Sequence, residues 1–154
     1  MTARRLSPLA VALVAAAACG SGTTRAPDVN KLPLVPGAQV VTKASQCDKG
    51  ANAFCAVELV VVDKHYKDSL SLLLSERDAL KRSGWTGTSP DTGEQAADIS
   101  PGQQLRVTYA TAAGDLKGID LGWIKRSRPV TVALSHAMFA RSPTLSMMLE
   151  LGAS

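Results

Sequence analysis

The sequence predicts an α+β two-layer domain, in which a mostly antiparallel sheet of about four or five strands carries two helices on one face. The candidate elements follow the order strand, strand, helix, several strands, helix, and consecutive strands favour antiparallel hairpins. The composition is 45% hydrophobic and 19% charged over 154 residues, which allows one buried core. Aromatic residues make up only 4%, so aliphatic residues and methionine must build that core.

Two strands are expected before the first helix. Residues 38–42 form a short strand candidate, and residues 54–62 form a longer one that is almost continuously apolar. One face of the longer strand is wholly apolar and consists of Cys55, Val57, Leu59 and Val61. Glu58 alone interrupts the other face, so the pattern predicts a central strand.

Glu58 is the one charge in this apolar run. We expect it on the solvent side of the sheet, in a cross-strand pair with Arg106. The alternative is a buried carboxylate with a raised pKa.

Residues 66–83 predict a helix. Its apolar stripe is expected to consist of Leu70, Leu73, Leu74 and Leu80. Its solvent side is expected to carry Lys67, Glu76, Lys81 and Arg82. Gly84 follows as a C-terminal stop.

Residues 89–102 predict a polar loop, because Pro90, Gly93 and Pro101 interrupt it. A structureless stretch of this length is either a mobile functional loop or an exposed connection. Its acidic residues are Asp91, Glu94 and Asp98, which lack the spacing of an EF-hand calcium loop and are interpreted as solvated side chains.

The C-terminal third predicts more strands and a second helix. Residues 105–110 alternate apolar and polar side chains, and residues 119–124 and 129–134 suggest two further strands. Ser142 and Pro143 offer an N-cap and a first helical position. The apolar face of the helix that follows consists of Leu145, Met148 and Leu149, and Gly152 ends it.

The N-terminus has the features of an export leader. Arg4 and Arg5 precede residues 6–18, which carry no charge, and Cys19 follows this stretch. This apolar stretch is too short to span a hydrocarbon layer, which takes about 20 helical residues. It has the length of the apolar region of a signal peptide.

The end of the leader, Ala16-Ala17-Ala18-Cys19, resembles the lipobox of bacterial lipoproteins, and the resemblance covers residues 1–22. In that family a diacylglyceryl group is attached to the cysteine sulfur, and a signal peptidase cleaves before the cysteine. The family most often has Leu where Ala16 stands. Cleavage by the ordinary signal peptidase after an Ala-x-Ala site, giving a secreted form, and an uncleaved anchor are the alternatives.

The resemblance implies three segments: residues 1–18 as the signal peptide, residues 19–36 as the lipidated Cys19 with a flexible tether, and residues 37–154 as the globular domain. The tether is rich in Gly, Ser, Thr and Pro. Lipid on Cys19 would place the domain on the outer face of the membrane, in the envelope of a bacterium. The alanine-rich leader resembles those of high-GC bacteria.

Three cysteines are an odd number for an exported protein. If Cys19 carries lipid, Cys47 and Cys55 remain, and in an oxidising compartment we expect them to form a disulfide. The alternative is a redox or metal pair. Their spacing is not Cys-x-x-Cys, and no further ligands lie close to them in the sequence.

Other candidate residues favour structural roles. His65 and His136 are the only histidines, and no Gly-x-Ser-x-Gly motif accompanies them. His136 and Met138, with Met147 and Met148, suggest either a soft-metal site or packing, and we favour packing. Trp85 and Trp123 are expected to cap the core, with ligand stacking as the alternative. The densest basic cluster consists of Lys125, Arg126 and Arg128, interpreted as a solvated turn or a contact with anionic headgroups.

These observations favour a binding or interaction module over an enzyme. The formal net charge is +4, and loss of Arg4 and Arg5 with the leader would lower it by two. The positive charge that remains is too small for a nucleic-acid-binding surface. We identify no catalytic, cofactor or metal site, and the one partner implied is the membrane, through lipid on Cys19. The alternatives are an envelope hydrolase, in which acidic residues of the 89–102 loop converge on a histidine, and a passive spacer.

Overall fold

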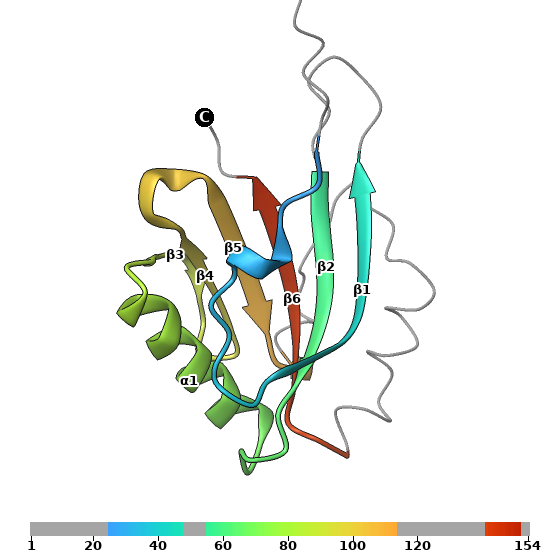
Figure 1. The fold of residues 1–154 in the computed structure, drawn as a ribbon. Coiled ribbons are helices and arrows are strands. Elements are labelled where there is room, and N and C mark those ends of the chain that lie inside the picture. The colour runs from blue at the N-terminus through green and yellow to red at the C-terminus, as the bar shows by residue number, and fades with distance from the viewer. Residues whose placement is uncertain (1–24, 48–54, 114–140, 152–154) are drawn as a thin grey trace, which may run out of the picture.

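The computed structural model describes residues 25–47, 55–113 and 141–151. Within these ranges the chain forms one antiparallel sheet of six strands and one α-helix (Figure 1). In spatial order the strands are β1 (Gln39–Cys47), β2 (Cys55–Val62), β6 (Thr144–Leu151), β5 (Leu105–Ala110), β4 (Gln95–Ile99) and β3 (Thr86–Asp91). The α+β class is confirmed, but the sheet has more strands than predicted, and the described residues contain one α-helix instead of two.

The strand predicted at 54–62 is β2, which is central as expected. It pairs with β1 on one side and β6 on the other, and all eight of its residues are buried. The expected short strand at 38–42 is the longer β1. The register between β1 and β2 shifts between Val40 and Thr42, which marks a bulge at Val41.

The predicted helix is confirmed as α1 (Ser69–Arg82). It begins with a capping box, in which Ser71 donates its backbone N–H to the Asp68 carboxylate and Asp68 donates its backbone N–H to the Ser71 hydroxyl. The predicted stripe is only partly right. The buried residues are Leu72, Leu73, Glu76, Ala79 and Leu80. Leu70 and Leu74 are exposed instead.

The predicted polar loop at 89–102 is wrong. Most of it belongs to a hairpin of β3 and β4 that turns near Gly93, whose φ is +83°. Pro90 lies on an edge strand of the described sheet, within the shift in β3–β4 register between Thr88 and Asp91, where proline is tolerated. Ala96 and Ala97 are buried at 3% and 1% exposure, so small side chains fill strand positions here.

The predicted C-terminal helix is also wrong, because Thr144–Leu151 forms β6, between β2 and β5. Leu145, Met147 and Leu149 all face the core beneath α1, as a period of two requires. The helical interpretation had chosen Met148, which lies on the other face. The strands predicted at 119–124 and 129–134 lie outside the described residues.

The core lies between the sheet and a layer made of α1 and residues 25–38, which cover the same face side by side (Figure 1). Helix α1 packs over β3, β4 and β6. Residues 25–38 include the short 3-10 helix η1 (Val29–Lys31), and their Leu32 and Val35 are buried in the core. Two residues of the stretch predicted to be a tether, Leu32 and Val35, therefore belong to the core.

Candidate functional site

A groove runs along β1, between this strand and the chain around η1. Its volume is about 700 Å³. The described residues that line it are Arg25–Asn30 on one wall, Val40–Lys43 and Ser45 of β1 on the other, and Val57 of β2. We call this feature the β1 groove.

The β1 groove combines exposed apolar side chains with positive charge. Val40 and Val41 are 37% and 46% exposed, which is unusual for two adjacent valines in a strand. Arg25 and Lys43 contribute cations from opposite walls. Among the described lining residues Asp28 is the one carboxylate, and its Oδ1 accepts a hydrogen bond from the Asn30 backbone N–H at 3.0 Å. The groove thus combines exposed valine side chains with a largely polar lining in which the described cations outnumber the carboxylate.

A buried carboxylate holds the wall of the groove in place. Glu76 of α1 is 1% exposed, and both of its carboxylate oxygens accept the backbone N–H of Val35, at 3.1 and 3.2 Å. The prediction that Glu76 lies on the solvent side of the helix is therefore wrong. Burial, with a smaller contribution from nearby Asp63, raises the pKa of Glu76 to about 7 although the Val35 N–H opposes this shift.

Asp63 and His65 form a second polar contact beside this one. The Oδ1 atom of buried Asp63 lies 2.7 Å from His65 Nδ1 and 2.9 Å from the His65 backbone nitrogen, while the His65 ring is 84% exposed. Gly37 packs against the pair with φ +99°, and a Cβ there would lie 3.1 Å from Asp63 Oδ2. The chain that leads into β1 therefore packs closely against Asp63 and His65 at Gly37.

An oriented histidine is one requirement of a hydrolase, and a nucleophile is another. Among the described residues His65 hydrogen-bonds only to Asp63, and no hydroxyl or thiol group reaches it. The acidic residue beside His65 comes from the end of β2 and not from the 89–102 segment. The convergence that the hydrolase hypothesis predicts is thus not found at His65, and His136 lies outside the described residues.

The acidic residues of the 89–102 segment are engaged elsewhere. Asp91 forms an ion pair with Arg77 at 2.9 Å, and Glu94 accepts a hydrogen bond from Thr111. Asp98 is 1% exposed and accepts the Tyr109 hydroxyl at 2.6 Å. The prediction of solvated side chains is therefore wrong for Asp98. Burial, followed by the Asp98 contact, raises the pKa of Tyr109 well above its ordinary value.

The predicted Glu58–Arg106 pair is replaced by another contact. Glu58 is 6% exposed, not solvated, and its strand neighbours are Ala44 and Met148. Arg106 lies two strands away, where its guanidinium contacts Glu150 at 3.5 Å and the Ser89 carbonyl at 2.9 Å. Burial raises the pKa of Glu150, and Arg106 opposes this shift.

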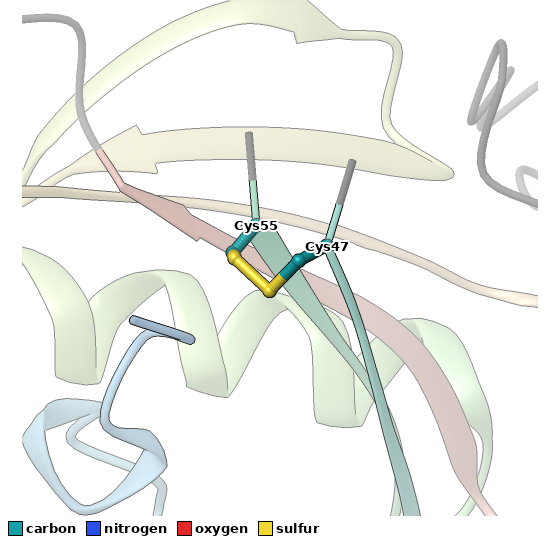
Figure 2. Close-up of a disulfide and its surroundings, with 2 residues drawn as sticks. All are labelled: Cys47 and Cys55. Atoms are coloured by element: carbon teal, nitrogen blue, oxygen red, sulfur yellow. A yellow bond between two sulfur atoms is a disulfide. The ribbon is translucent and has the colours of Figure 1, made fainter. Parts of the chain in front are cut away.

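The disulfide between Cys47 and Cys55 is present and joins adjacent ends of β1 and β2 (Figure 2). The two residues are direct cross-strand partners in the antiparallel register. Cys55 is fully buried, whereas Cys47 is exposed. The bridge ties the β1 wall of the groove to the central part of the sheet.

The remaining candidates divide into core residues and residues outside the described ranges. Trp85 is 6% exposed and belongs to the core, as expected. Met147 and Met148 are buried on opposite faces of β6, so they pack separately instead of converging on one ion. The candidates that lie outside the described residues are Cys19, Trp123, Lys125, Arg126, Arg128, His136 and Met138.

No protein-family model, curated protein or solved structure matches this chain. Within the described ranges, no three His, Cys, Asp or Glu side chains are grouped so as to hold a metal ion. In the same part of the chain, no helix has both the length and the apolar character to cross a membrane.

The β1 groove is not predicted from the sequence. Its wall falls in a stretch whose prolines and small polar residues indicate a tether. Leu32 and Val35 were the available signal, because two apolar side chains three residues apart in a tether suggest a docked segment.

Proposed function

We propose that this chain is a lipid-anchored protein of the bacterial cell envelope that binds an envelope partner in the β1 groove. The single observation that supports the binding role is the groove itself, with exposed valines on its β1 wall and one cation on each wall. Contiguous exposed apolar surface on a small domain is typical of an interaction site.

The leader and the disulfide support the location. Cys19 follows a stretch that resembles a lipobox, and the Cys47–Cys55 bridge suits an oxidising compartment. Two or more acyl chains anchor a protein stably without help from its surface. The exposed Val40 and Val41 are therefore not needed for membrane attachment and are available for a partner.

Photo-crosslinking in intact cells tests the binding role. A photoreactive residue replaces Val41 in one strain and Leu74 of α1 in another, because these side chains are almost equally exposed, at 46% and 45%. We expect a discrete adduct with an envelope component from position 41 and none from position 74. Absence of an adduct at position 41, or equal adducts at both positions, would contradict the proposal.

Intact-mass measurement tests the anchor separately. We expect the mature chain to begin at a diacylated Cys19, and the Cys19→Ala variant to lose that mass and leave the membrane fraction. A wild-type N-terminus without lipid would refute the anchor while leaving the groove experiment valid.

A further inference from the structure

Strand β1 lies at one edge of the sheet that the described residues form. Among the described strands β1 pairs only with β2, and its register is regular from Thr42 to Cys47. Thr42 and Lys43 point to opposite faces of the sheet, yet both line the groove. The groove therefore reaches the strand backbone itself, where N–H and C=O groups along the edge can pair with an added strand.

Resting on the binding role proposed above, we propose that the β1 groove takes an extended peptide segment with carboxylate side chains, which adds to β1 as a further strand. Backbone hydrogen bonds to the edge of β1 would hold such a peptide, and alternate side chains would enter the groove. Val40, which is 37% exposed, would contact an apolar side chain of the peptide there.

Charge selects the kind of peptide. Lys43 is the one charged residue in β1, and Arg25 faces it from the opposite wall. The Asp28 carboxylate offsets one of these two cations, so the described lining keeps a net positive charge. An acidic segment is therefore complementary to this surface, whereas a basic segment would meet both cations.

The same charge disfavours a second copy of this chain as the occupant. Antiparallel pairing of two β1 edges brings their Lys43 side chains toward one another, and edge lysines are a known protection against such self-association. The bulge at Val41 also shortens the regular edge available for self-pairing.

Fluorescence anisotropy with the full chain in detergent tests this inference. The probe is a blocked, labelled peptide of alternating Val and Glu, and the comparison peptides carry Gln or Lys in place of Glu. We expect the Glu peptide to bind about tenfold more tightly than the Gln peptide, as two partly shielded ion pairs allow, and the Lys peptide to bind most weakly. Equal binding of the Glu and Gln peptides would overturn the charge argument.

Strand addition and charge are tested by separate arms. A Val/Glu peptide with a methyl group on every backbone nitrogen keeps its charge but has no N–H to donate on either edge, so we expect it not to bind. We also expect amide hydrogen exchange of β1 residues between Thr42 and Gln46 to slow when the unmodified peptide binds. Full binding of the methylated peptide would show that the groove binds the peptide as an anion without strand pairing, and would overturn the inference. A dimer of this chain without peptide, detected by sedimentation, would also overturn it.

Variants complete the test. Lys43→Glu should reverse the preference toward the Lys peptide, and Lys43→Gln, which leaves Arg25 in place, should lower the preference for the Glu peptide to about threefold. The matched control Lys81→Glu changes an exposed lysine of α1 outside the groove and should leave peptide binding unchanged. A position 41 adduct in cells without acidic-peptide binding would reject this occupant alone. Absence of that adduct would reject the binding role itself.

Discussion

The two halves of the sheet are covered in different ways. Over β3, β4 and β6 the cover is α1, a capped helix whose Leu72, Leu73 and Leu80 are almost completely buried. Beside β1 the cover is the irregular chain around η1, and the β1 groove remains between them. A regular helix closes one half, whereas the segment that covers the other half leaves part of its strand exposed.

The polar contacts follow the same division. Under α1, Asp98 and Tyr109 are paired in the interior at 2.6 Å, and Arg77 is paired with Asp91. Next to the groove, Glu76 is the carboxylate that holds Val35, and burial raises its pKa. The helical half therefore provides most of the buried core, while the β1 half depends on a few specific contacts to keep its groove.

The largest expected effect comes from truncating the closed half. Leu73→Ala removes a side chain with no exposure and should lower the free energy of unfolding by about 2–5 kcal/mol. Val41→Ala in the groove should change it by less than about 0.5 kcal/mol. Urea denaturation of both variants measures the contrast, and equal losses would contradict the division of the sheet into closed and open halves.

Glu76 should make the β1 half sensitive to pH. Its folded-state pKa of about 7 lies above the ordinary 4.5, so the folded state keeps a proton that the unfolded state loses. The contribution of Glu76 protonation to the free energy of unfolding is therefore fully present below pH 4.5 and is lost as the pH rises through about 7. Glu76→Gln keeps an oxygen for the Val35 N–H and removes the titration.

Unfolding of wild type and Glu76→Gln in urea at pH 5 and pH 8 tests this prediction. From pH 5 to pH 8 we expect the free energy of unfolding of the wild type to fall by up to about 3 kcal/mol more than that of the variant. Identical pH dependence in the two proteins would show that Glu76 does not titrate between them.

The disulfide should contribute less than the core but more than any surface contact. In the chain-entropy model, a loop of this length contributes about 2.5 kcal/mol before any strain. Replacing Cys47 and Cys55 together with Ala should lower the stability by up to that amount, measured by thermal unfolding. The matched comparison is wild type with and without reductant, and a reduced wild type as stable as the oxidised protein would contradict the expectation.

The sequence was informative where one element has one strong periodicity. Residues 69–82 and 105–110 were recognised because a single pattern describes each of them. Thr144–Leu151 was misassigned because Leu145 and Leu149 satisfy both helical and strand spacing, and only pairing with β2 and β5 decides between them.

The site was harder to predict because its parts are far apart in the chain. Val35 and Glu76 lie 41 residues apart, and nothing local to Glu76 distinguishes it from a solvated helix residue. The disulfide could be predicted, because cysteine number and compartment are properties of the sequence alone. The groove depends on how residues 25–38 dock, which a tether-like composition conceals.

Filling the β1 groove tests the central claim most directly. Ser45 is an exposed lining residue, so Ser45→Trp should occupy the groove with little effect on stability. The measurement is the yield of the adduct from a photoreactive residue at position 41 in intact cells, with and without this substitution. We expect the adduct to be lost although the protein folds and reaches its normal location, and an undiminished yield would show that the β1 groove is not the binding surface.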